Sequence, residues 1–228
     1  MFEITLYPTY SEVFATSELE GVFYPLCTIT TALNEQLHFV SHNGMWIDEE
    51  VNSQENNRQF TRFSIQDGKY VFAGETSLYK GYEVAKQVYP IIAADFTANG
   101  IAYLNSKKKI GEYIDEILPK LCDLNLGDFD VEYYLQTFYE YSINKADYQR
   151  SGKFGRFRQV IDGWGKADES DYVYTDLEGL DTHCAATASG QFEAIGYTIG
   201  SEFFTDGNDN CLYYDKQNKN VLLVNHYG

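Results

Sequence analysis

The chain has 228 residues, 44% of them hydrophobic and 16% aromatic, so it can bury a core without disulfides or metal ions and is not disordered throughout. Its formal net charge of −17 argues against nucleic acid or an anionic membrane as a partner, because phosphate binding depends on clustered Lys and Arg. The chain has no apolar run of about 18 residues and no basic, apolar secretory signal at its start, so we expect a cytoplasmic protein.

The 20 Tyr and 15 Phe residues favour a strand-rich protein, since these side chains suit pleated, half-buried surfaces. The alternation over Phe2–Leu6 predicts a first strand, and Tyr10–Leu19 is predicted to be a short helix. Further along, Asp67-Gly68 separates two aromatic-rich segments, Phe60–Ile65 and Lys69–Phe72, which predicts a tight hairpin.

Residues 31–43 fit two local structures. As a helix, the segment places its apolar residues on one face and ends at Gly44. As a hairpin, Asn43-Gly44 forms the turn between Leu37–His42 and Met45–Ile47. Of the two structures, we expect the helix.

The segment that follows the 60–72 hairpin is predicted to contain a short helix and another strand. The helix covers Tyr82–Tyr89 and ends at Pro90, because proline removes a backbone donor. The strand covers Ile101–Leu104 and follows a turn at Asn99-Gly100.

The clearest helical periodicity lies between Ser106 and Arg150. Apolar residues three and four apart from Ile110 to Leu121 predict a helix with one buried face, with Ser106 as its N-cap and a tightened last turn at Pro119. A second helix is predicted from Val131, capped by Asp128 or Asp130.

The remainder of the chain is predicted to be strand-rich, with its last two strands paired as a hairpin. The expected strands are Tyr172–Tyr174, Gln191–Thr198, Cys211–Tyr214 and Val221–Asn225. The elements together predict an α+β protein with antiparallel sheets flanking a central pair of helices. A boundary between Ser151 and Gly165 divides it into lobes of residues 1–150 and 151–228, or both belong to one continuous domain.

The acidic residues are unevenly distributed. Residues 1–57 and 167–215 contain no Lys or Arg, whereas the intervening segment is nearly balanced. Two such flanks either form a solvated surface that keeps the protein soluble, or steer a basic protein into contact.

Motifs for catalysis or metal binding are incomplete. His38 and His42 are four apart but lack the Glu of H-E-x-x-H, and His183-Cys184 has no second ligand pair nearby. Asp206–Asn210 begins like a calcium loop, but Cys211 replaces the required Gly. We therefore expect no metal or other cofactor, and we expect the four cysteines to be free buried thiols.

Two segments resemble the SMI1/KNR4 (SUKH) superfamily. Phe203–Asp215 followed by Val221–His226 is similar to its C-terminal hairpin, and Leu37–Gly44 is similar to its helix ending in Asn-Gly. The resemblance implies a non-enzymatic bacterial immunity protein that binds and blocks a toxin, often a basic nuclease or deaminase.

The first functional hypothesis is therefore an acidic protein that neutralises a basic toxin or effector by covering its active surface. We expect carboxylates and aromatic anchors to contact that partner, namely Asp168, Glu169, Asp171, Glu202, Asp206, Asp209, Trp164 and Tyr213. The alternative is a small metal-dependent hydrolase whose site is assembled from His38, His42, His183 and dispersed carboxylates. A third is a subunit of a larger assembly.

Overall fold

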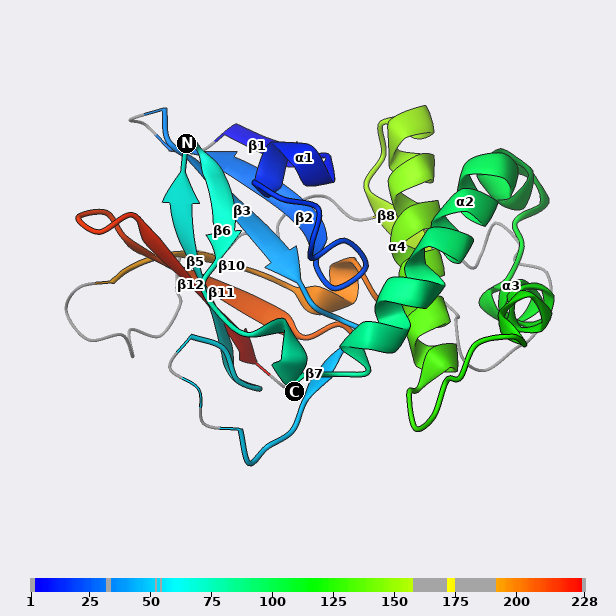
Figure 1. Ribbon diagram of the computed structural model, residues 1–228. Helices are drawn as coiled ribbons and strands as arrows, with labels where there is room; N and C mark the ends of the chain where they lie inside the picture. The colour runs from blue at the N-terminus through cyan, green and yellow to red at the C-terminus, as the bar shows by residue number, and fades with distance from the viewer. Residues whose placement is uncertain are drawn as a thin grey trace.

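The computed structural model describes residues 3–31, 34–51, 53, 55–157, 172–174 and 192–226. The sheets occupy one half of the molecule and the long helices the other, as Figure 1 shows. The α+β class with antiparallel sheets is therefore confirmed. The helices lie beside the sheets and not between them (Figure 1).

The first sheet has three strands in the order β1-β2-β3. They are β1 (Glu3–Leu6), β2 (Tyr24–Thr30) and β3 (Gln36–Ser41). The first predicted strand is confirmed, but the helix expected over residues 31–43 is wrong, because its second half is β3. All residues of β3 after Gln36 are buried, so apolar and polar residues do not alternate and no strand period is visible in the sequence.

Strand β3 is held along both of its edges. On one side it pairs with β2, with Leu37 opposite Ile29. On the other side the Tyr70 hydroxyl accepts a hydrogen bond from His38 N at 2.7 Å and donates one to His38 O at 2.9 Å. These bonds satisfy the backbone N–H and C=O groups of His38. Because Tyr70 is distant in the chain, the sequence of the 31–43 segment does not reveal them.

A turn is present at Asn43-Gly44, but it does not close the alternative hairpin. Gly44 has a φ of +84°, in the left-handed region that favours glycine. The next strand, β4 (Trp46–Ile47), pairs with the distant β7 (Tyr79–Lys80) and not with β3.

The second sheet has five strands in the order β10-β11-β12-β5-β6. They are β10 (Glu193–Thr198), β11 (Asp209–Asp215), β12 (Asn220–His226), β5 (Phe60–Gln66) and β6 (Lys69–Phe72). Both predicted hairpins are confirmed as β5–β6 and β11–β12. Because β12 also pairs with β5, strands from either side of the expected boundary belong to one sheet. A separate pair joins β8 (Gly155–Phe157) to β9 (Tyr172–Tyr174).

Helix α2 (Tyr82–Ser106) runs without interruption through Pro90. The expected helix end at Pro90 and the expected strand over Ile101–Leu104 are therefore wrong. The proline lies on the exposed side of the helix, and a buried face continues past it to Leu104, so packing outweighs the lost hydrogen bond. Gly100 lies against the ring of Phe96 in the same helix and does not form a turn.

The two central helices follow the prediction closely. α3 (Ile110–Ile117) continues into the 3₁₀ segment η2 (Leu118–Leu121), which is the tightening expected at Pro119, although the N-cap is Lys109 and not Ser106. α4 (Val131–Ser151) begins after Asp130, whose side chain accepts a hydrogen bond from Tyr133 N at 3.1 Å. The first helix, α1 (Tyr10–Val13), is shorter than expected.

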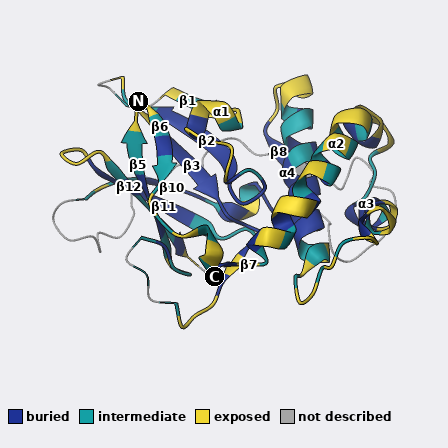
Figure 2. Cartoon of the chain, in the orientation of Figure 1, coloured by how far each residue is buried: buried dark blue, intermediate teal, exposed yellow. Residues whose placement is uncertain are grey.

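Buried residues of the sheets and of α4 belong to one hydrophobic core, and Figure 2 colours the buried residues dark blue. The buried Glu140 on α4 accepts hydrogen bonds from Thr205 N at 3.0 Å and from Thr205 Oγ1 at 2.7 Å. Thr205 lies in the loop between the 3₁₀ segment η4 (Gly200–Glu202) and β11. The two bonds hold this loop against α4.

Candidate binding site beside Trp46

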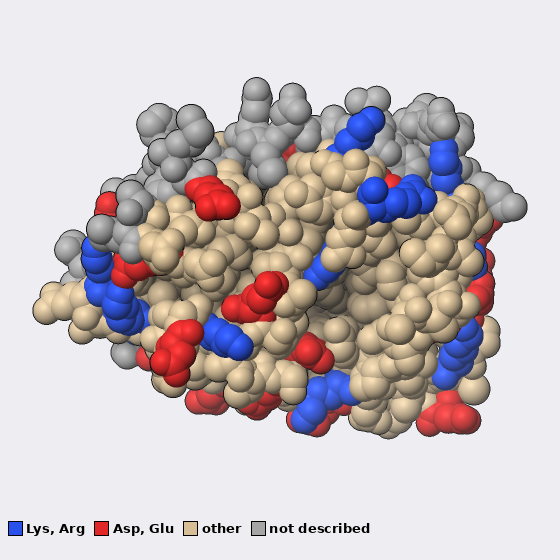
Figure 3. All heavy atoms as spheres, turned by 90° about the horizontal axis from the view of Figure 1, so that it is seen from above, with Lys and Arg blue, Asp and Glu red and all other residues tan. Residues whose placement is uncertain are grey.

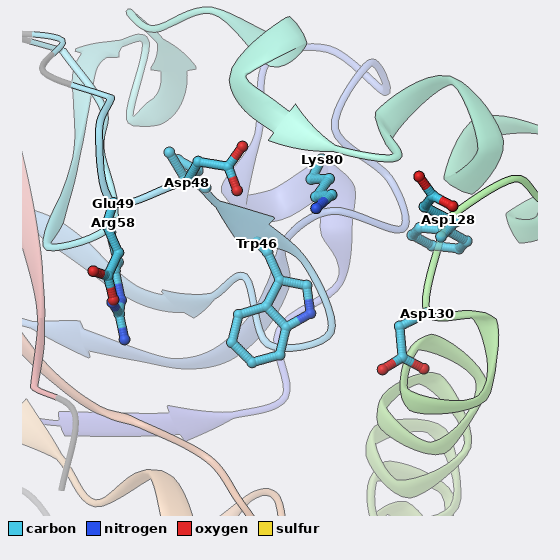
Figure 4. A pocket seen from close by; sticks show the side chains of 9 residues that line it. Trp46, Asp48, Glu49, Arg58, Lys80, Asp128 and Asp130 are labelled. Atoms are coloured by element: carbon cyan, nitrogen blue, oxygen red, sulfur yellow. The ribbon is translucent and has the colours of Figure 1, made fainter.

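A hollow of about 310 Å³ opens between the β4–β7 ribbon and the start of α4. We call it the Trp46 hollow, and its lining residues are Trp46, Ile47, Asp48, Glu49, Arg58, Lys80, Asp128, Phe129 and Asp130. In Figure 4 the indole of Trp46 lies between Glu49 and Arg58 on one side and Asp128 and Asp130 on the other.

Trp46 is an exposed aromatic residue with a fixed orientation. The residue is 45% exposed, and Trp46 and Ile101 are the exposed large hydrophobic residues of the described chain. The indole stacks on the ring of Tyr133 of α4, with 5.4 Å between ring centroids and 29° between planes. One face of the indole is therefore packed against the protein, and the stacking limits the motion of the ring.

The turn that carries Trp46 is tied to α4. The Tyr133 hydroxyl donates to Asn43 Oδ1 at 3.1 Å, and Asn43 Nδ2 donates to Thr137 Oγ1 at 3.2 Å. Gly44 also lies close to the helix, since a Cβ atom at this position would be 3.1 Å from Thr137. The position of Trp46 therefore depends on contacts between segments about 90 residues apart in the chain.

The helical side of the hollow is anchored to the strand side by Phe129. Gly81, which follows β7 and has a φ of +78°, packs against the Phe129 ring, where no side chain could fit. Asp130 caps α4, and Asp128 and Asp130 are exposed at the rim. Both walls of the hollow are thus joined below its opening.

Carboxylates outnumber cations in this hollow. Asp48, Glu49, Asp128 and Asp130 face two cations, Arg58 and Lys80. Arg58 forms an ion pair with Glu49. Lys80 lies directly opposite Trp46 in the β4–β7 pairing, so both side chains are on the same face of the ribbon. Because the carboxylates of the lining outnumber its cations, the net negative charge favours a cationic guest.

The predicted contact residue Asp206 lies next to this site. Burial and the Asp206 carboxylate together raise the pKa of Tyr133, the residue on which Trp46 stacks. Asp206 is exposed, so it extends the acidic rim beyond the hollow.

The other predicted contact residues do not join this site in the described structure. Asp209 Oδ1 accepts a hydrogen bond from Gly200 N at 2.8 Å, which holds the loop before β11, and Glu202 is half-buried in η4. Tyr213 is 2% exposed and belongs to the interior, so it is not a surface anchor. Four further predicted residues lie outside the described chain: Trp164, Asp168, Glu169 and Asp171.

Trp46 is not among the contact residues predicted from the sequence. It is one of only two tryptophans in the chain and follows an Asn-Gly turn, which is the signal that could have drawn attention to it. The face seen in Figure 3 shows Lys and Arg interspersed with Asp and Glu, so the negative charge is not gathered into one patch on that face.

The two histidines proposed as metal ligands are separate and buried. His38 Nδ1 lies 2.8 Å from Thr28 Oγ1, and burial lowers the pKa of His38 to about 4. His42 Nε2 accepts from Asn225 Nδ2 at 2.7 Å, so the proton of the neutral ring is on Nδ1, which lies 3.3 Å from Met45 O. Within the described ranges, no group of three or more His, Cys, Asp or Glu could hold a metal ion, and His183 lies outside those ranges.

The cysteines differ in their surroundings. Cys27 and Cys211 are free and buried as expected, whereas Cys122 is free and exposed, and Cys184 lies outside the described chain. None of the helices in the described part combines the length and apolar character needed to cross a membrane.

No family model, curated protein or solved structure matches this chain. Residues 203–215 and 221–226 include the β11–β12 hairpin, whereas Leu37–Gly44, predicted to be a helix, is a strand and a turn.

Proposed function

We propose that this protein is a non-enzymatic binding protein that neutralises a basic toxin or effector by covering its active surface. The observation that carries the proposal is Trp46, an exposed aromatic residue fixed on Tyr133 at the edge of a carboxylate-rich hollow. Tryptophan is the residue type most enriched at the energetic centres of protein interfaces. A tryptophan held in place before binding loses little conformational entropy when a partner covers it.

The charge of the chain supports a basic partner. A net charge of −17 attracts cationic proteins and speeds their association. Asp48, Asp128, Asp130 and Asp206 place carboxylates around Trp46, where they can pair with the Lys and Arg that a toxin uses to hold an anionic substrate. Neutralisation would then follow from occlusion. The C-terminal hairpin that resembles the SUKH superfamily fits the same role, that of a bacterial immunity protein acting in the cytoplasm.

The test is capture of a partner by tagged protein, followed by measurement with the purified partner. We expect one basic protein to be retained at low salt and released as salt rises. Trp46→Ala should abolish its capture. The matched control Ile101→Ala, which removes an exposed large hydrophobic side chain from α2, should not. The purified partner should lose its activity on adding one equivalent of the protein. Equal capture by both variants, or undiminished partner activity, would overturn the proposal.

A further inference from the structure

We infer that the Trp46 hollow receives a single arginine side chain of the partner. This inference rests on the proposed function and names the group that the site recognises. The hollow, at about 310 Å³, lies at the lower end of the range for small-molecule sites, so it has room for one large side chain.

The open face of Trp46 suits a planar cation. Its opposite face is occupied by Tyr133, yet the residue remains 45% exposed. A guanidinium group stacks on an indole face through cation–π attraction, and tryptophan is the strongest aromatic partner for it. Arginine stacks in this way better than lysine because its charge is spread over a planar group.

The carboxylates at the helical rim can accept hydrogen bonds from the guanidinium group. Asp128 and Asp130 are exposed and lie across the hollow from the Glu49 and Arg58 pair, as Figure 4 shows. A guanidinium stacked on Trp46 points its N–H groups outward in its own plane, parallel to the indole, where a carboxylate can accept them in pairs. Arginine therefore satisfies both the aromatic and the acidic parts of the hollow.

The charge of Lys80 distinguishes a cationic guest from an anionic one. Its ammonium group shares the hollow with Trp46, and like charge opposes a cationic guest. Removing the Lys80 charge should therefore strengthen binding of arginine. If the guest were an anion, Lys80 would be its main attraction and the same change would weaken binding.

The experiment uses a single-tryptophan protein. Trp164→Phe leaves Trp46 as the only indole, so its fluorescence and its indole N–H resonance report on the hollow alone. The probes are capped pentapeptides of glycine with arginine, citrulline or glutamate at the centre. Citrulline is the matched control, because it has nearly the shape of arginine but no charge.

We expect the arginine peptide to give a saturable shift of the Trp46 signals at millimolar concentrations, and the citrulline peptide to give none. The double variant Asp128→Asn, Asp130→Asn should weaken arginine binding by about fivefold, and Lys80→Gln should strengthen it by about twofold to fivefold, as typical of exposed charge pairs. Asparagine keeps the N-cap of α4, so the double variant should remain folded.

Other outcomes separate this inference from the proposed function. Binding of the glutamate peptide, or weaker arginine binding in Lys80→Gln, would overturn the inference. If no peptide binds while capture of a basic protein still depends on Trp46, the inference fails and the proposed function stands. If the arginine peptide binds as expected but no basic protein is captured, the inference stands and the proposed function fails.

Discussion

Gly81 and Phe129 are in such close contact that a Cβ atom on Gly81 would lie 2.1 Å from Phe129 Cδ2. Gly81 follows strand β7 and Phe129 lies just before helix α4, so this contact joins the two walls of the Trp46 hollow. A methyl group at Gly81 would have to displace the aromatic ring, and with it the segment that carries Asp128 and Asp130.

Gly81→Ala should therefore lower the free energy of unfolding by about 2 to 4 kcal/mol, from left-handed strain and overpacking combined. It should also reduce arginine-peptide binding, because the rim carboxylates move. Urea unfolding followed by circular dichroism measures the first effect, and peptide titration measures the second.

Gly68→Ala is the matched control. Gly68 has the same φ of +78° as Gly81, but an added Cβ atom meets nothing within 4 Å. It should cost only the backbone strain, about 1 to 2 kcal/mol, and leave peptide binding unchanged. Equal losses of stability in the two variants would show that the Phe129 contact contributes nothing.

Asp130 combines a structural role with the proposed binding role, and two substitutions separate them. Asp130→Ala removes the bond to Tyr133 N and should cost about 1 kcal/mol of stability, whereas Asp130→Asn can keep that bond. Both remove one negative charge from the rim, so both should weaken arginine-peptide binding. Thermal unfolding and peptide titration of the two variants measure the roles independently, and undiminished binding in both would exclude Asp130 from the site.

Buried histidines should make the protein less stable as the pH falls. The pKa of His38 is lowered to about 4 from its ordinary value of 6.5, because burial disfavours the charged ring. The unfolded chain therefore binds a proton between pH 6.5 and 4 that the folded protein does not, and stability is lost across this window as the pH decreases. Burial lowers the pKa of His42 in the same direction.

The expected loss attributable to His38 between pH 7 and pH 5 is about 2 kcal/mol, at roughly 1.4 kcal/mol per pH unit below the unfolded pKa. Urea unfolding at both pH values measures it. His38→Gln should reduce the pH dependence and leave the part due to His42. An unchanged pH dependence in this variant would show that His38 titrates normally in the folded protein.

Local signals in the sequence predicted the parts of the fold that local interactions determine. Asp67-Gly68 fixes its hairpin because both residues adopt positive φ. Asp130 caps the start of α4, and Pro119 lies in the tightened 3₁₀ turn after α3. The predictions failed at Pro90 and over Leu37–Ser41, where contacts with distant segments decide the structure.

The candidate site depends even more on distant contacts. Trp46, Lys80 and Asp130 come from three separate segments, and the β4–β7 ribbon that brings two of them together has only two residue pairs. A two-residue strand has no hydrophobic period to detect. Charge and the family resemblance predict Asp206 as a contact residue, and it lies beside Tyr133 because its loop packs on α4.

The packing of this loop on α4 depends on Glu140. Glu140 is fully buried on α4 and accepts two hydrogen bonds from Thr205, one residue before Asp206. Glu140→Ala should cost about 2 to 4 kcal/mol, because it leaves the half-buried Thr205 donors without these acceptors and opens a cavity at the buried Glu140 position. Glu140→Gln keeps an acceptor oxygen and nearly the same volume, so it should cost less. Hydrogen exchange at Thr205 N measures the local effect directly: faster exchange is expected in Glu140→Ala than in Glu140→Gln. If Asp206 contributes to the acidic rim, Glu140→Ala should also slow association with the basic partner, and an unchanged association rate would remove Asp206 from the binding surface.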